Sequence, residues 1–93
     1  MKIKIWELSP RNFELEEKGY IEAEEFHADN CWHLCNWDCW TDEKPENLHS
    51  DLYVVNSDVI FYNPKENKYY LALSVGWCIK DTLEEIVEYR MKK

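Results

Sequence analysis

Glycine is scarce in this 93-residue chain, which contains only Gly19 and Gly76. A phosphate-binding loop or a dinucleotide-binding fingerprint needs several glycines, because the backbone must approach the ligand closely. The sequence therefore excludes both nucleotide-binding motifs. No apolar run approaches the ~18 residues of a membrane-spanning helix, and the first residues lack the apolar core of a signal peptide. We therefore expect a protein that is neither inserted into a membrane nor exported.

Basic residues are nearly absent from residues 12–43, where ten acids accompany one base, Lys18. The whole chain has a formal net charge of −8. Residues 1–11 contribute +2 and residues 44–93 contribute −1, so the acidity is local. This field disfavours direct binding to nucleic acid or to an anionic membrane, and it favours a basic partner protein.

Hydrophobic residues make up 45% of the chain and aromatic residues 15%, which is enough for a core. The length predicts a single domain over residues 1–93. Among the five tryptophans, we expect most to be buried, because a small domain needs large apolar side chains. One or two exposed tryptophans would mark a partner surface.

The N-terminal third predicts a strand and then a short helix. Residues 2–8 alternate in the manner of a strand. Ser9 and Pro10 then suit a helix start, and Gly19 suits its end. An alternative is that this stretch is itself a strand, pairing with the next segment across Lys18 and Gly19. Residues 20–27 favour an extended conformation over a helix.

The C-terminal half predicts strands at residues 52–55, 59–62 and 69–75 and a final helix. Pro64 and Asn67 lie between the last two strands and suit a hairpin turn. Thr82 and Glu85 form a capping box at the start of the helix. The expected fold is therefore α+β, with a small antiparallel sheet of three to five strands packed against a C-terminal helix, and with a short N-terminal helix.

Residues 28–43 contain three of the five tryptophans and three of the four cysteines, and their pattern fits neither a helix nor a strand cleanly. Residues 41–50 read as a polar loop. The cysteine and histidine cluster could hold zinc, with Cys31, Cys35, Cys39 and His33 as candidate ligands. On a helix, however, Cys31 and Cys39 would lie ~12 Å apart, too far for one ion to take all three thiols.

Two other interpretations of these cysteines compete with zinc. Buried free cysteine commonly packs as a small hydrophobic residue, so the cluster could be part of the core with no cofactor. A catalytic thiol would need an electropositive setting, and the surrounding acids supply the opposite. We therefore expect a protein that is not an enzyme.

The acidic stretch is the main candidate for a functional surface. Carboxylates can bind a groove lined with lysine and arginine, and two of them two residues apart on a strand would lie ~6.7 Å apart, close to the phosphate spacing of one nucleic-acid strand. The alternative is a solvated surface that serves solubility. The candidate partner-binding residues are Glu16, Glu17, Glu22, Glu24, Glu25 and Asp29.

In size, acidity and lack of a catalytic motif, the chain is similar to phage-encoded inhibitors of nucleic-acid enzymes, such as uracil-DNA glycosylase inhibitors and anti-CRISPR proteins. The resemblance is one of composition and covers no aligned stretch. The resemblance implies an acidic inhibitor that mimics nucleic acid and blocks a nucleic-acid-binding enzyme. It also implies a location in the cytoplasm, which for a phage protein is the cytoplasm of the host cell. The alternative function is a zinc-stabilised protein-interaction module that uses the Cys/His cluster at residues 27–39.

Overall fold

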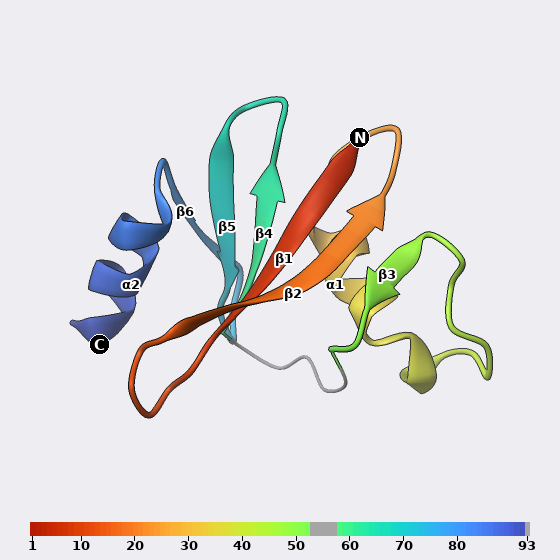
Figure 1. Ribbon diagram of the computed structural model, residues 1–93, viewed down its shortest axis with the longest axis horizontal. Helices are drawn as coiled ribbons and strands as arrows, with labels where there is room; N and C mark the ends of the chain where they lie inside the picture. Colours follow the sequence, from red (N-terminus) through yellow and green to blue (C-terminus); the bar gives the residue numbers. More distant parts are fainter. Residues whose placement is uncertain (53–57, 93) are drawn as a thin grey trace.

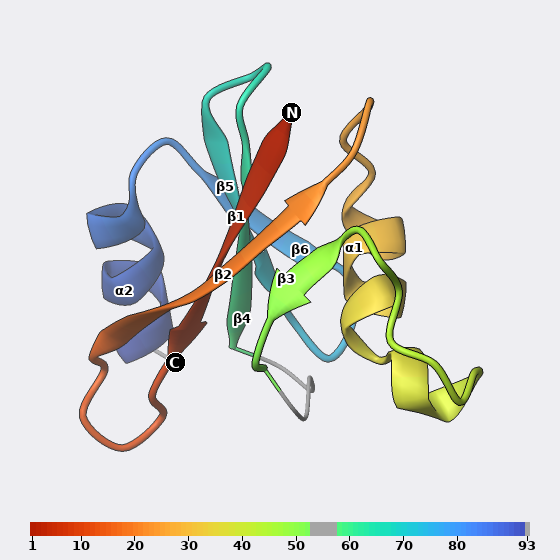
Figure 2. The same ribbon diagram turned by 45° about the vertical axis from the view of Figure 1, so that its right-hand side comes forward.

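A six-stranded antiparallel sheet forms the centre of the computed structural model, which describes residues 1–52 and 58–92 (Figure 1). The strands lie in the order β3-β2-β1-β4-β5-β6. Figures 1 and 2 show helices α1 and α2 on opposite sides of this sheet. The elements in chain order are β1 (Lys2–Leu8), β2 (Leu15–Glu22), α1 (Ala28–Cys35), the 3₁₀ helix η1 (Trp37–Cys39), β3 (Leu48–Ser50), β4 (Val59–Asn63), β5 (Lys68–Ala72), β6 (Trp77–Lys80) and α2 (Leu83–Met91).

Strand β1 lies in the middle of the sheet and confirms the strand expected at residues 2–8. Its alternating side chains divide the core into two parts, one on each face of the sheet. Ile3 and Ile5 are fully buried in the cluster on the α1 face, whereas Leu8 is fully buried in the cluster on the α2 face. Strand β1 therefore contributes buried side chains to both faces of the sheet.

The helix expected after Ser9 is wrong, because residues 9–14 form a tight loop that leads into β2. The Ser9 hydroxyl accepts a hydrogen bond from the Arg11 N–H at 3.3 Å, and the Asn12 side-chain oxygen accepts one from the Glu14 N–H at 3.1 Å. Serine, proline and asparagine serve turns as well as helix starts, so the local signal was ambiguous. The β1–β2 ladder, which begins at the Leu8–Leu15 pair, decides in favour of a hairpin.

Gly19 lies inside β2 and does not end a helix. The register with β1 jumps between Ile5 and Trp6, which pair with Gly19 and Glu17, so Lys18 is the extra residue of a β-bulge. Gly19 has a φ of +112°, and a Cβ at this position would collide with the carbonyl oxygen of His49. Only glycine lets β3 approach β2 here. Strand β2 continues through Lys18 and Gly19 and pairs with β1 and β3, so the alternative strand pairing across these two residues is also wrong.

The extended conformation expected for residues 20–27 continues only to Glu22, where β2 ends. The segment that fitted neither period becomes helix α1, followed by η1. The polar loop expected at residues 41–50 is wrong for its last three residues, because Leu48–Ser50 pair with β2 as strand β3. A strand of only three residues gives no clear local signal in the sequence. The pairing of β3 with β2 depends on the bulge at Gly19.

The hairpin expected in the C-terminal half is confirmed. Strands β4 and β5 pair in antiparallel fashion up to the Asn63–Lys68 pair, and Asn67 has the left-handed φ of +56° that asparagine tolerates. Phe61 on β4 is fully buried on the α1 face, and Ile60 is fully buried on the α2 face. The strand expected at residues 52–55 falls mostly outside the described residues.

Helix α2 confirms the expected C-terminal helix. The Thr82 hydroxyl accepts a hydrogen bond from the Glu85 N–H at 3.1 Å, which caps the first turn. Ile86 is fully buried against the sheet. Arg90 donates to the carboxylate of Asp58 through Nε at 2.7 Å, so the helix is also tied to the start of β4.

The expected fold is therefore wrong in two respects. The sheet has six strands among the described residues instead of three to five, and β6 had no counterpart in the sequence analysis. The short N-terminal helix is absent from residues 9–18, and the second helix is α1 at Ala28–Cys35. The result is a sheet-dominated domain with two short helices, one of them C-terminal. No helix among the described residues has the length and apolar character to cross a membrane.

Candidate binding surface

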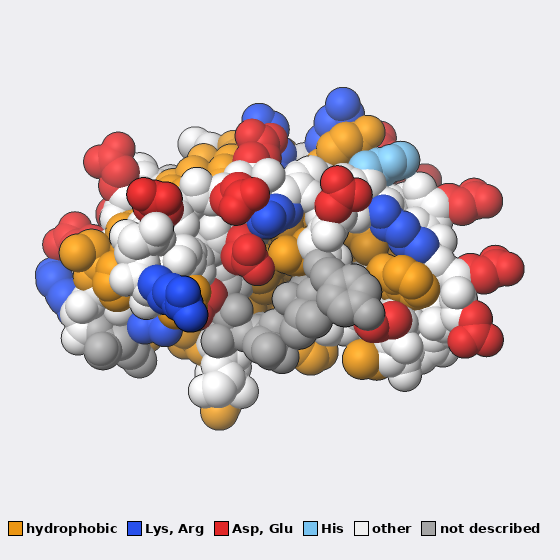
Figure 3. All heavy atoms as spheres, turned by 60° about the horizontal axis from the view of Figure 1, so that its bottom comes forward, with side chains coloured by type: hydrophobic (Ala, Val, Ile, Leu, Met, Phe, Trp, Pro, Cys, Tyr) orange, Lys and Arg blue, Asp and Glu red, His pale blue; other side chains and the backbone are white. Residues whose placement is uncertain are grey.

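All ten carboxylates of residues 12–43 have exposed side chains. Figure 3 shows acidic side chains projecting from the end of the molecule that η1 and its connection to β3 form, whereas basic and acidic side chains lie close together at the α2 end. From Glu22 to Glu43 the chain has no lysine or arginine. These acids are Glu14, Glu16, Glu17, Glu22, Glu24, Glu25, Asp29, Asp38, Asp42 and Glu43.

The six predicted partner-binding residues fall into two groups. Glu16 and Glu17 lie near the start of β2, and Glu22 ends the same strand. At ~3.3 Å per residue, the two ends of this row are roughly 20 Å apart. Glu16 pairs across the ladder with Glu7 and bonds to Lys18 at 3.0 Å, and Glu17 pairs with Trp6. Both glutamates line a hollow at the β2–β3 edge. Glu16 and Glu17 therefore form the first group, which lies apart from the other four residues.

The second group lies together on the connection from β2 to α1. Glu22 is the last residue of β2, Glu24 and Glu25 follow it, and Asp29 lies in the first turn of α1. The strand spacing expected between Glu22 and Glu24 does not apply, because the strand ends at Glu22. The backbone of Ala23 is held by hydrogen bonds with Met1, so the connection is anchored to β1.

Two of these acids have partners that orient them. The Glu25 carboxylate lies 3.1 Å from His27 Nε2, and the Asp29 Oδ1 accepts a hydrogen bond from the Trp77 indole N–H at 2.9 Å. The second contact joins α1 to β6 across 48 positions of sequence. Sequence reasoning missed Trp77 for this reason, because no local pattern links residues that only the fold brings together.

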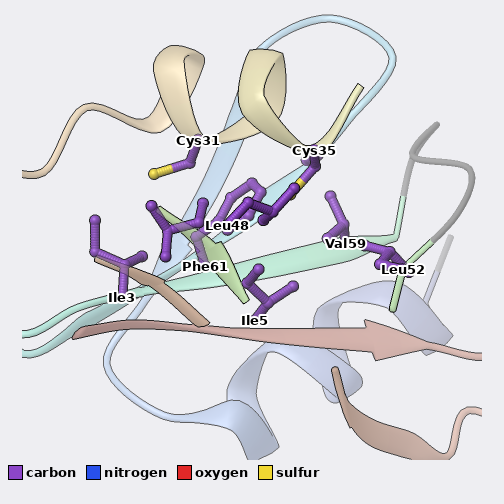
Figure 4. Close-up of a cluster of buried hydrophobic side chains, with 10 residues drawn as sticks. Ile3, Ile5, Cys31, Cys35, Leu48, Leu52, Val59 and Phe61 are labelled. Atoms are coloured by element: carbon purple, nitrogen blue, oxygen red, sulfur yellow. The ribbon is translucent and has the colours of Figure 1, made fainter. Parts of the chain in front are cut away.

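The four candidate zinc ligands point to different sides of the chain. Cys31 and Cys35 project from α1 into the core, toward Phe61 and its neighbours (Figure 4). His33 and Cys39 are exposed, and His33 stacks on Trp40 with ring centroids 4.6 Å apart. Within residues 1–52 and 58–92, no three His, Cys, Asp or Glu side chains are grouped as metal ligands. The zinc-stabilised module therefore stays a prediction without a site in this part of the chain.

The buried thiols are also poor nucleophiles. Burial raises the pKa of Cys31 to about 12, and burial together with the nearby Cys31 raises the pKa of Cys35 to about 12. Both thiols are therefore protonated at neutral pH, and the thiolate is the form that attacks or binds metal. Packing as small hydrophobic residues accounts for their place in the core.

The expectation that most tryptophans are buried is wrong, because three are half-buried and two are exposed. Trp6, Trp37 and Trp77 are half-buried against the two core clusters. Trp32 on α1 is 39% exposed and Trp40 after η1 is 47% exposed. Both exposed rings therefore lie in the most acidic part of the chain, and aromatic side chains near a charged rim are common at interface hot spots.

The candidate site is therefore the acidic surface, and a hollow at the β2–β3 edge adjoins it at Glu16 and Glu17. Comparisons of the chain with protein-family models, with curated proteins and with solved structures found no significant match. The proposals below accordingly rest on the residues and their geometry.

Proposed function

We propose that this protein is a non-enzymatic binding protein whose acidic surface occupies the nucleic-acid site of a basic, nucleic-acid-handling enzyme. The observation that carries the proposal is the exposure of all ten carboxylates of residues 12–43, with Lys18 as the one lysine or arginine among them. Residues 12–43 carry a net charge of −9, with Lys18 as their one lysine or arginine. The electric field of this segment attracts a basic protein surface and speeds the association of the two proteins.

The connection from β2 to α1 is the centre of this surface. Glu22, Glu24, Glu25 and Asp29 follow one another there, and two exposed aromatic rings, Trp32 and Trp40, come later in the same acidic stretch. Carboxylates bind lysine and arginine through charge-assisted hydrogen bonds, and exposed rings add apolar contact area. Glu16 and Glu17 lie farther along β2 and would extend the contact over the sheet edge.

The test compares two double charge reversals that change the net charge equally. Glu24→Lys/Glu25→Lys alters the proposed surface, and Glu84→Lys/Glu88→Lys alters exposed acids of α2. Each tagged protein is incubated with a cell lysate, washed across a salt series and then treated with added DNA or RNA. The wild type and the α2 variant should retain a nucleic-acid-binding protein at low salt and release it with high salt or nucleic acid.

The Glu24/Glu25 variant should lose that partner while its thermal unfolding stays unchanged. Retention by this variant, or a partner that responds to neither salt nor nucleic acid, would contradict the proposal. Equal loss in both variants would show a response to net charge alone and would also contradict the assignment of the surface.

A further inference from the structure

A hollow beside the acidic connection combines indole rings with a carboxylate. It has a volume of about 350 Å³ and lies between the first turns of α1 and the β5–β6 turn. Asp29, Trp32 and His33 line it from α1, and Leu73, Gly76 and Trp77 line it from the β5–β6 side. From this lining we propose that the hollow receives an arginine side chain of the basic partner. The inference rests on the proposed function, because it assigns chemistry to the partner of the same surface.

The carboxylate of Asp29 is held in position at the hollow. Its Oδ1 accepts from the Trp77 indole N–H at 2.9 Å, and within the described residues its second oxygen makes no hydrogen bond. A guanidinium group offers a planar set of N–H donors that suits such an oxygen. The Asp29–Trp77 bond also joins α1 to β6, so the acceptor does not need to be ordered when the partner arrives.

The Trp77 ring is fixed by the core behind it. Its centroid lies 5.9 Å from that of Phe61 and 6.3 Å from that of Tyr70, and Tyr70 in turn contacts Phe26 at 4.7 Å. Trp32 supplies a second, more exposed indole to the same hollow. Cations bind indole rings better than other aromatic rings, and arginine stacks on them more often than lysine does.

The charge around the hollow selects the occupant. The segment from Glu22 to Glu43 has no lysine or arginine, so an anionic ligand would meet repulsion there. An uncharged apolar side chain would leave the Asp29 oxygen desolvated without a partner, which costs free energy. Arginine satisfies the carboxylate and the indoles together, whereas lysine presents a compact, strongly hydrated ammonium.

The experiment measures a preference and not binding alone, because any cationic peptide will bind a protein of charge −8 to some extent. Two peptides of equal length carry four arginines or four lysines separated by glycine and serine. Their dissociation constants are measured by isothermal titration calorimetry. The wild type should bind the arginine peptide about tenfold more tightly than the lysine peptide.

Two variants should remove this preference, and one should keep it. Trp32→Ala removes an exposed indole of the hollow, and Asp29→Asn removes the charge but keeps an oxygen for the Trp77 N–H. Both should bring the ratio of the two constants close to one. Met91→Ala removes an exposed apolar side chain of α2 that does not line the hollow and should leave the ratio unchanged. Equal binding of the two peptides by the wild type, or a preference that persists in both variants, would overturn the inference.

The two proposals fail in distinguishable ways. Glu24→Lys/Glu25→Lys should lower the affinity of the protein for both peptides. It should preserve the preference for the arginine peptide, since neither residue lines the hollow. A salt-sensitive partner combined with no arginine preference would leave the proposed function standing and remove the arginine site. An arginine preference combined with a partner indifferent to the charge reversal would leave the arginine site standing and remove the proposed function.

Discussion

The α1 side and the α2 side of the sheet use charge differently. On the α2 side, acids are matched by bases of the same chain: Arg90 binds Asp58, Lys68 binds Asp81 and Lys92 binds Glu88. On the α1 side, the stretch from Glu22 to Glu43 has no lysine or arginine of its own, although Lys2 lies across the ladder from Glu22 and His27 contacts Glu25. Each side has its own core cluster: α1 contributes Cys31 and Cys35 to one, and α2 contributes Ile86 to the other.

The difference separates stability from recognition. A partly buried ion pair such as Arg90–Asp58 contributes to the fold, whereas exposed ion pairs and exposed unpaired carboxylates contribute little to stability. An exposed unpaired carboxylate keeps its charge for a partner molecule. Substitution of Asp58 or Arg90 should therefore act on folding. Substitutions of acids on the α1 side should act on binding.

The largest expected effect tests whether the cores of the two sides are comparable. Phe61→Ala on the α1 face should lower the free energy of unfolding by about 3–5 kcal/mol, because Phe61 is fully buried and the cavity cannot collapse. Ile86→Ala on the α2 face should cost about 2–5 kcal/mol. Val75→Ala serves as the control, since Val75 is 89% exposed. Urea unfolding measures all three, and a loss below about 1 kcal/mol at either core position would break the comparison.

The next effect sharpens the contrast in charge. Asp58→Asn should destabilise the protein by about 1–3 kcal/mol, because Arg90 loses a charged partner whose side chain is 12% exposed. Asparagine tolerates the left-handed φ of +70° at this position, so the substitution isolates the charge. Glu24→Gln on the α1 side should change stability by less than about 0.5 kcal/mol. Equal losses in the two variants would show that the acidic surface is needed for folding.

The smallest effect concerns the buried thiols of α1. Their folded-state pKa of about 12 lies above the ordinary 9.0, so their contribution is complete below pH 9 and is lost as the pH rises toward 12. At about pH 10, stability should fall by roughly 1 kcal/mol for each thiol relative to neutral pH. Cys31→Ala should flatten this slope, whereas Cys39→Ala should not, because Cys39 is exposed. Denaturant unfolding between about pH 8 and pH 10 measures both slopes.

Local sequence signals were sufficient where neighbouring residues decide the structure. The β4–β5 hairpin follows from its turn residues and strand formers, and the start of α2 follows from Thr82 and Glu85. The alternation of β1 was equally clear. In each of these elements the hydrogen-bonding partners are close in sequence or the apolar period is clean.

The signals failed where distant partners decide. Ser9 and Pro10 suit a helix or a turn, and pairing with β1 settles the matter. Gly19 reads as a helix end, but its positive φ serves the approach of β3, 30 positions away. Among the described residues the candidate zinc ligands lie apart for a similar reason, because α1 places Cys31 and Cys35 in the core and leaves His33 exposed. The acidic set was visible in sequence, but its division into two groups was not.

The sequence by itself determined the local acidity of residues 12–43, the scarcity of glycine, the strand at residues 2–8, the hairpin and the C-terminal helix, because composition, period and turn chemistry are local properties. The tertiary structure alone decided that all ten acids lie on the surface, that Cys31 and Cys35 lie in the core, and that Asp29 meets Trp77 across the molecule. Burial and long-range contact depend on how the strands pair, and pairing is settled by the energy of the whole sheet and not by any one segment.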